Sequence, residues 1–221
     1  MAINTDALAQ IHYFNGLSHS ELEAVKKYIA FEKTIEKGET LLYEDDQSDY
    51  MYFVISGAVK VYKRSINGKE QILNLASTGE SLNDVSTFDG GGCAADMLAM
   101  APVRLYAVRK EDIKALFSKY PRVALNAVGV LASKVRGDSS LVEVLSFDLV
   151  ISRLAKFLLK QSTTGAHTLP LLTQQDLAAM VGASRVVVNR SLRTMEEKGA
   201  IRLVRRRIVI TDEGVLKTLV T

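Results

Sequence analysis

Hydrophobic and polar residues alternate with a period of two through much of the segment from Leu41 to Val108, which is the pattern of half-buried β-strands. Gly57, Gly68 and Gly79 separate short apolar runs within it. The Asn67-Gly68 dipeptide lies between two of these runs, and such a dipeptide is a strong signal for a hairpin. The segment therefore predicts an antiparallel roll or barrel.

Helical patterns flank the predicted roll on both sides. Ser18 and Glu21 have the spacing of a capping box, and a short helix, LEAVKKYIA, is expected after them. A second helix is predicted from Glu111 to Tyr120, because the residue ahead of Pro121 disfavours helical backbone angles. A third and longer helix is predicted from Pro121 toward Leu145.

The long helix carries apolar residues at heptad spacing, which makes it a candidate coiled-coil seam between two copies of the chain. The residues of the seam are Val128, Leu131, Val135, Val142 and Leu145. Asp138 falls where the pattern requires an apolar residue, and the neighbouring Gly137 weakens the helix by about 1 kcal/mol relative to alanine. A helix that packs only on its own domain is the alternative.

Two short helices joined by a tight turn are predicted between Thr173 and Met195. Thr173 and Asp176 form a capping box, and Gly182 is placed where the chain must adopt a positive φ. Ser184 is expected to cap the second helix. The apolar face of the first helix consists of Leu177, Met180 and Val181. This is the layout of a helix-turn-helix.

The second of these helices has a polar side with the chemistry of a base reader. Val188, Leu192 and Met195 share one face, which leaves the arginines and Asn189 on the other. An arginine fork matches guanine, an asparagine amide matches adenine, and Val186 can contact a thymine methyl group. A merely solvated helix face is the alternative.

A basic hairpin is predicted directly after this helix. The segment from Ala200 to Thr211 contains IRLVRRRIVIT, in which two alternating apolar runs surround Arg205, Arg206 and Arg207. Basic tips of this kind contact phosphates. The residues that we predict to contact DNA are Thr173, Gln174, Gln175, Ser184, Arg185, Val186, Val187, Asn189, Arg190, Arg193 and Arg206.

The charge of the chain is unevenly distributed. From Ile151 onward the sequence contains 12 Lys and Arg against 5 Asp and Glu, whereas residues 1–150 contain 16 against 20. The formal net charge of +3 therefore conceals a basic C-terminal third and an acidic remainder. Because the basic part contains the predicted helix-turn-helix, it has the electrostatic character of a nucleic-acid-binding domain.

Several classes of protein are disfavoured by what the sequence lacks. Cys93 is the single cysteine, so the chain has no internal disulfide framework and no all-cysteine metal site. The first residues lack the basic and apolar regions of a signal peptide, and no run approaches the length of a membrane span, so we expect a cytoplasmic protein without a membrane partner. Because the sequence contains no nucleophile elbow, Walker loop or HExxH pair, we do not expect an enzyme.

The order of these elements resembles the family of the cyclic-AMP receptor protein and the fumarate and nitrate reduction regulator, from about Tyr13 to Asp212. The strongest motif is VGASRVVVNRSLRTME, and DYMYFVISGAVKVY, NGKEQIL and TGE resemble the family's roll. The resemblance implies an α+β bacterial transcription regulator that acts as a homodimer on double-stranded DNA, and that contacts RNA polymerase if it is an activator. It implies a β-roll sensor of the cyclic-nucleotide-binding type (residues 1–120), a dimerisation helix (121–146) and a winged helix-turn-helix (147–221).

By the same resemblance, Arg185 and Arg190 match base-contacting arginines, whereas Ser184 and Gln175 match phosphate-contacting positions. Val186 departs from the pattern, because the cyclic-AMP receptor proteins have a base-contacting glutamate there. We therefore expect this chain to prefer a different DNA sequence.

The effector pocket implied by the resemblance consists of Asn83, Asp84, Cys93, Ala94, Ala95, Asp138 and Ser139. Asp84 matches the glutamate that contacts the ribose, but Ala94 and Ala95 replace the arginine and serine that hold the cyclic phosphate. Because a phosphodiester without a counter-charge is costly to desolvate, we expect cyclic AMP to bind weakly or not at all. The Gly90-Gly91-Gly92 run offers backbone N–H groups to an anion, or else forms only a turn.

Other modes of sensing stay open at this level. The sensor domain binds another small molecule, binds haem, responds to oxidation of Cys93, or has no effector. A further alternative is an activator that responds to a cyclic nucleotide. His12, His19 and Cys93 are the conceivable haem ligands, although no cofactor is expected. A signal in the roll is expected to reach the DNA-binding heads through the long helix near Asp138 and a hinge near Phe147 and Asp148.

Overall fold

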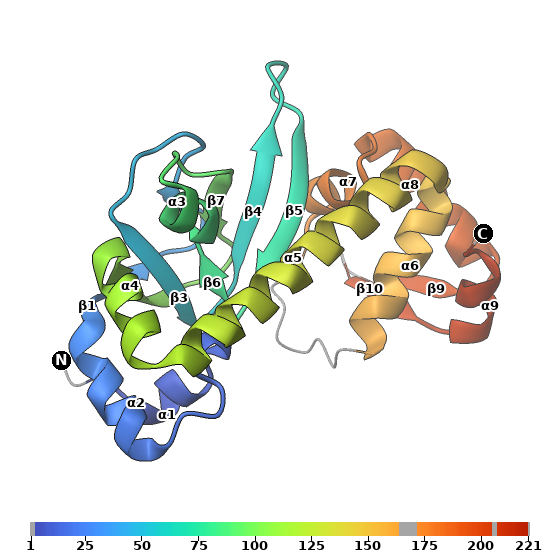
Figure 1. The fold of residues 1–221 in the computed structure, drawn as a ribbon. Coiled ribbons are helices and arrows are strands. Elements are labelled where there is room, and N and C mark those ends of the chain that lie inside the picture. The colour runs from blue at the N-terminus through green and yellow to red at the C-terminus, as the bar shows by residue number, and fades with distance from the viewer. Residues whose placement is uncertain (1–2, 164–171, 205–206, 221) are drawn as a thin grey trace. The chain divides into compact units, whose positions relative to one another are not determined.

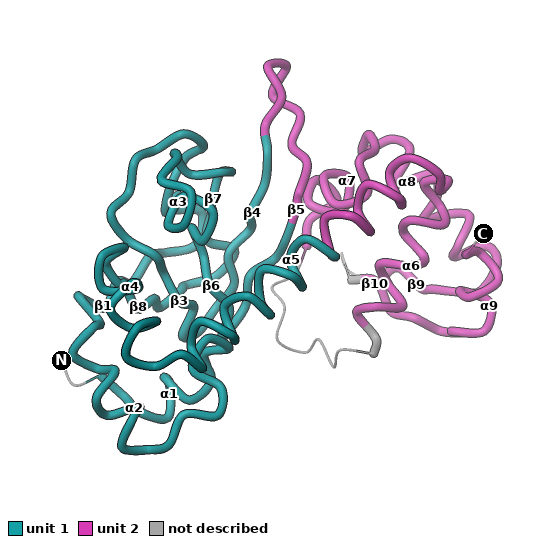
Figure 2. Tube along the Cα trace, in the orientation of Figure 1, with its two compact units in different colours: residues 1–63, 74–136 teal, residues 64–73, 137–221 magenta. Residues whose placement is uncertain are grey.

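The computed structural model describes residues 3–163, 172–204 and 207–220. They form two compact units, which Figure 2 shows in different colours. One unit consists of residues 1–63 and 74–136, and the other of residues 64–73 and 137–221. The boundary between the units therefore falls inside the long helix α5 (Pro121–Phe147), next to Gly137.

The first unit begins with four short helical elements. They are α1 (Thr5–Ala9), η1 (His12–Phe14), α2 (His19–Val25) and η2 (Lys26–Tyr28). The predicted capping box at Ser18 and Glu21 is confirmed. The helix predicted over LEAVKKYIA is helical through Tyr28 and wrong only in its last two residues, because Ile29 already pairs with Val108 in a sheet. The long-range strand pairing prevails there over a local helical pattern.

Eight strands form the roll (Figure 1). They are β1 (Ile29–Ile35), β2 (Thr40–Leu42), β3 (Tyr50–Ser56), β4 (Val59–Arg64), β5 (Glu70–Ala76), β6 (Ser81–Leu82), β7 (Asp96–Ala99) and β8 (Val103–Arg109). They make two four-stranded sheets, in the orders β1-β8-β3-β6 and β2-β7-β4-β5. The predicted hairpin at Asn67-Gly68 is confirmed between β4 and β5, with Gly68 at a φ of 74°. The predicted antiparallel roll is therefore confirmed.

Two helices accompany the strands of the roll, α3 (Asp84–Asp89) after β6 and α4 (Lys110–Lys119) after β8. The helix predicted over residues 111–120 corresponds to α4, whereas α3 was not predicted. The first half of α5 packs on the roll, where Val123 and Ala127 are buried in one apolar cluster with Phe53 and Leu116.

The second unit contains the end of α5 and a small helical domain with a two-stranded sheet. Its further elements are α6 (Val150–Thr163), α7 (Gln174–Val181), α8 (Arg185–Glu197), β9 (Ile201–Val204), β10 (Arg207–Ile210) and α9 (Glu213–Thr218). Leu154, Leu177 and Leu192 belong to a single buried cluster that holds these helices together. β9 and β10 pair antiparallel, which confirms the predicted hairpin. In the part of the chain that the structure describes, no helix is both long and apolar enough to cross a membrane.

Candidate nucleic-acid interface and sensor pocket

Caps fix both the start of α7 and the turn that leads from α7 into α8. The Thr173 hydroxyl accepts a hydrogen bond from the Asp176 amide at 3.1 Å, and the Asp176 carboxylate accepts one from the Thr173 amide at 2.9 Å. Gly182 then has a φ of 64°. A Cβ atom at this position would lie 2.6 Å from Leu145 Cδ2, at the end of a side chain that could shift, so the positive φ is the main reason for a glycine here. Ser184 caps α8 through the Val187 amide.

α8 separates buried apolar residues from an exposed polar side, as the sequence predicts. Val188, Leu192 and Met195 are buried, whereas Arg185, Arg190 and Arg193 are exposed and Asn189 is half-buried. Val186 is 71% exposed. Gln175, Ser184 and Arg185 line one shallow depression of about 450 Å³, together with Lys69 and Glu70 of the β4–β5 hairpin. The start of α7 and the start of α8 thus present polar side chains on one continuous surface.

The other residues that we predicted to contact DNA are also exposed to solvent where the structure describes them. Thr173 and Gln174 are exposed at the start of α7, and Val187 is 40% exposed. Arg206 lies outside the described residues, as does its neighbour Arg205.

Arg153 holds this domain against the end of α5, and sequence reasoning missed it. Its guanidinium donates to the carbonyl oxygens of Leu145 at 2.8 Å, Asp148 at 2.9 Å and Val181 at 2.9 Å. These oxygens belong to the last turn of α5, the break between α5 and α6, and the last turn of α7, which all lack intrahelical donors. No local pattern marks Arg153, because its three partners are 5, 8 and 28 residues away.

Asp84 is the centre of a buried polar network in the roll. Its side chain is 4% exposed, accepts a hydrogen bond from the Tyr13 hydroxyl at 2.6 Å and forms an ion pair with Lys134 of α5. The Lys134 ammonium also donates to the Ser81 carbonyl oxygen at 2.9 Å and lies 3.3 Å from the Ser81 hydroxyl. Both carboxylate oxygens of Asp84 therefore have partners within the chain.

The electrostatics of this network favour the charged carboxylate. Burial by itself raises the pKa of Asp84, but the Lys134 charge and hydrogen bonds from Lys134, Ser81 and Tyr13 outweigh burial and lower the pKa below its usual range. Burial, followed by the charge and hydrogen bond of Asp84, raises the pKa of Tyr13 above its usual range. The network thus consists of an ionised carboxylate, an ammonium and a protonated phenol.

The other predicted pocket residues in the roll lie in different surroundings. Asn83 adopts a φ of 66° ahead of α3, and its amide nitrogen donates to the Tyr50 carbonyl oxygen at 2.8 Å. Cys93 and Ala95 are buried, and Ala94 is exposed. The Asp84 carboxylate accepts hydrogen bonds from Tyr13, Ser81 and Lys134, whereas the Cys93 thiol donates to the Ala95 carbonyl oxygen.

The glycine run after α3 serves to shape a tight turn. Gly90 ends α3 with a φ of 76°, and the Gly91 amide donates to the Asp89 carboxylate at 2.8 Å. A Cβ atom on Gly92 would lie 2.7 Å from the Asp45 carbonyl oxygen. Close backbone approach at Gly92 and the intrachain partner of the Gly91 amide account for this run.

The candidate haem and redox residues differ in their exposure to solvent. His12 is exposed, and the imidazole of His19 is 79% exposed. Cys93 is 1% exposed and lies in an apolar cluster of the roll. Burial raises the pKa of its thiol above the usual range, with a further increase from Asp46 and Asp96. The thiol is therefore protonated at neutral pH.

α5 has an exposed apolar stripe. Leu125 is 73% exposed, Val128 is 63% exposed, and Val135 and Val142 are each 64% exposed. Leu125 was not part of the predicted seam, whereas Leu131 and Leu145 of that seam are half-buried. Asp138 and Ser139 are exposed on the same helix.

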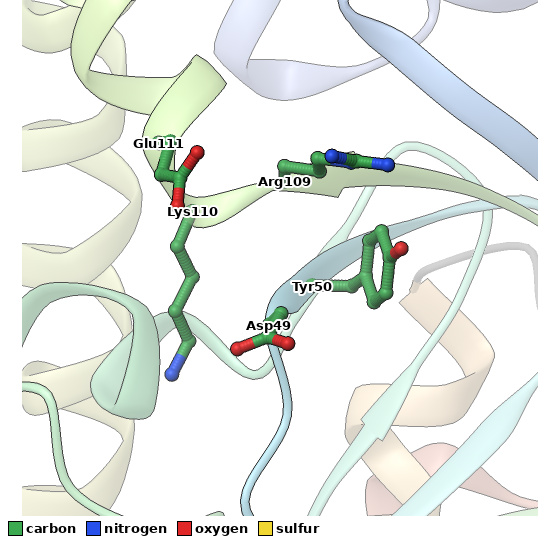
Figure 3. Close-up of a pocket in the computed structure, with 5 residues that line it drawn as sticks. All are labelled: Asp49, Tyr50, Arg109, Lys110 and Glu111. Carbon is green, nitrogen blue, oxygen red and sulfur yellow. The ribbon is translucent and has the colours of Figure 1, made fainter.

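A separate cleft of about 310 Å³ lies where β3 begins and β8 leads into α4 (Figure 3). Its lining residues are Asp49, Tyr50, Arg109, Lys110 and Glu111. The formal charges of its two acidic and two basic residues cancel. The Lys110 ammonium donates to the buried Ser86 hydroxyl at 2.9 Å. None of these residues was predicted as part of the effector pocket.

Comparison with known proteins agrees with this architecture in both units. Residues 32–120 match the cyclic nucleotide-binding domain, and residues 152–219 match the Crp-like helix-turn-helix domain. The chain is 30% identical to the cyclic AMP receptor protein of Thermus thermophilus over 206 residues, which cover 93% of this chain and 95% of that protein. The chain belongs to the Crp/Fnr family of transcription regulators.

Solved structures of related transcription regulators share the fold of this chain. The Thermus thermophilus catabolite activator protein is 29% identical, with a TM-score of 0.56 over 95% of this chain and 98% of that one. The regulator CLP of Xanthomonas campestris, which is described as responsive to c-di-GMP, is 19% identical, with a TM-score of 0.77 over 86% of this chain and 99% of that one. Proteins that share this fold are thus named for different nucleotides, cyclic AMP in the Thermus thermophilus receptor protein and c-di-GMP in CLP.

Proposed function

We propose that this Crp/Fnr regulator is a homodimer that reads a two-fold symmetric DNA site with α8 of each copy. The observation that carries the proposal is that Arg185 and Arg190 are exposed and Asn189 is half-buried on the side of α8 opposite its buried apolar face. An exposed arginine or asparagine on a helix that fits the major groove can make bidentate contacts to a base. In this proposal residues 1–120 sense, 121–146 dimerise and 147–221 bind DNA.

The exposed stripe of α5 supports the dimer. Leu125, Val128, Val135 and Val142 place large apolar side chains in water along one side of a single helix. A second copy of the same helix would cover these side chains at heptad spacing. Two recognition helices would then address half-sites about 34 Å apart.

The dimer is tested by a charge placed in the stripe. Val135→Asp should give a monomer in light scattering at micromolar concentration, whereas Val85→Asp, at a 50% exposed position on α3, should not change the mass. DNA binding is tested by selecting bound duplexes from a random pool. A two-fold symmetric consensus is expected, and the absence of any enriched sequence at low salt would refute the proposal.

We further propose that cyclic AMP is not the effector. Ala94 and Ala95 carry no cation for a cyclic phosphate, and Asp84 already has partners on both oxygens. The name of the 30% identical Thermus thermophilus protein favours the alternative, a cyclic-AMP-responsive activator. Calorimetry with cyclic AMP decides between them, since micromolar binding together with a changed operator affinity would support the alternative.

A further inference from the structure

The predicted effector pocket has no cation at Ala94, but the long helix α5 supplies one to the roll. Lys134 extends from α5 to Asp84, and its ammonium has acceptors in Ser81 and Asp84. We propose that Lys134 is a built-in ligand of the sensor domain, whose ammonium holds α5 on the roll in the active state without a small molecule. The inference rests on the proposed function, because its readout is the affinity for DNA.

The contacts of Lys134 provide an acceptor for each of its three N–H donors. An ammonium has three N–H donors, and here it meets one carbonyl oxygen, one hydroxyl and one carboxylate. Its main partners are buried, since Ser81 is 2% exposed and Asp84 is 4% exposed. The Lys134 side chain itself is 30% exposed, so it closes the network from the rim.

The position of Lys134 on α5 links the network to the helix. Val123 and Ala127, which pack on the roll, share a face with Lys134 by helical spacing, whereas the neighbouring Val135 is 64% exposed on the other side. One side of the helix is thus bound to the roll through a charge pair, and the other side carries the exposed Val135. A molecule that approaches Asp84 must first displace the lysine.

This arrangement predicts which ligands compete. An anion finds Asp84 already neutralised and gains no free cation, whereas a primary amine can occupy the same acceptors as the lysine. A ligand shifts the state of a protein only through its different affinity for the two states. A covalently attached ammonium has no such concentration dependence, so the DNA affinity of the wild-type protein should not depend on cyclic AMP.

The test replaces Lys134 by alanine, adds a free amine in its place, and measures the affinity for DNA. Lys134→Ala should bind the selected operator at least about tenfold more weakly than the wild type, within the usual range of coupling between sites. n-Butylammonium at millimolar concentration should restore most of the loss, because it supplies an ammonium on an alkyl chain one carbon longer than the three carbons that the substitution removes. 1-Butanol, of similar length without the charge, should not. Arg136→Ala, an exposed cation on the same helix, is the matched control and should bind as the wild type.

The outcomes separate the inference from the proposed function. A wild type that binds no operator refutes the proposed function. The inference is then tested by the melting temperature of Lys134→Ala, which n-butylammonium should raise and 1-butanol should not. No increase with n-butylammonium would overturn the inference. Unchanged or tighter operator binding by Lys134→Ala overturns the inference. Weaker binding that the amine does not restore also overturns it, since a purely structural role would produce that result. An operator affinity of the wild type that depends on cyclic AMP would also overturn the inference.

Discussion

The guanidinium of Arg153 donates a hydrogen bond to the carbonyl oxygen of Val181, 2.9 Å away. The same side chain donates to Leu145 and Asp148, so one residue of α6 joins the end of α5 to the helix-turn-helix. The carbonyl groups at helix ends have no partners within the helix. A cation that satisfies three of them fixes the orientation of α7 relative to the hinge.

Arg153→Met should therefore loosen this junction. Hydrogen bonds that involve a charged group contribute about 1.5–3 kcal/mol each in favourable cases, and we expect a total loss of about 3 kcal/mol because water can replace part of them. Urea unfolding of the DNA-binding unit measures this loss. Arg153→Lys should recover little, since an ammonium cannot reproduce the planar fork. A stability equal to that of the wild type would contradict the assigned role.

Arg185→Ala should lower both affinity and discrimination. An arginine that binds a guanine contributes about 1–3 kcal/mol of discrimination, so binding to the selected operator should weaken and the preference at one base pair should relax. Titration of the consensus and of its single-base variants measures both quantities. Lys217→Ala on α9, whose side chain is 67% exposed, serves as the control and should leave the preference unchanged. An equal loss on all sequences would assign Arg185 to phosphate contact instead.

Two glycines should respond to alanine in opposite directions. Gly182→Ala places a Cβ atom 2.6 Å from Leu145 Cδ2 at a φ of 64°, so we expect a loss of about 1–3 kcal/mol. Gly137→Ala meets nothing within 4 Å in the interior of α5 and should stabilise the helix by about 0.5–1 kcal/mol. Denaturant unfolding of the two variants measures both effects, and the same sign for both would refute the backbone argument.

The network around Asp84 predicts a pH dependence of stability. Because the folded pKa of Asp84 lies below the unfolded value of about 3.9, its contribution is fully present above that value and is lost as the pH falls through the folded pKa. Asp84→Asn should destabilise the protein by about 3 kcal/mol at neutral pH, the lower end for a broken buried pair because Lys134 is 30% exposed. Thermal unfolding at a series of pH values should show the difference from the wild type shrinking below about pH 4. A difference that grows toward low pH would mean that Asp84 is protonated in the folded state.

The features that the sequence predicted are those with local signals. The caps at Thr173 and Ser184 and the glycine at 182 act within three or four residues, so the helix-turn-helix could be placed closely. β1 was missed because its formation depends on pairing with β8, about 75 residues later in the chain. Lys134 was missed for the same reason, since 50 residues separate it from Asp84 and no short motif connects them. Arg153 likewise acts through tertiary contacts alone.

Because Lys134 and Val135 are neighbours that face different sides of α5, the helix is constrained in length as well as in composition. An insertion of one residue after Lys134 would turn everything downstream by about 100° around the helix axis and carry Val142 out of line with Val128. Only changes of about seven or eleven residues preserve the phase of such a helix. Descendants of this gene should therefore accumulate replacements in α5 far more readily than insertions or deletions.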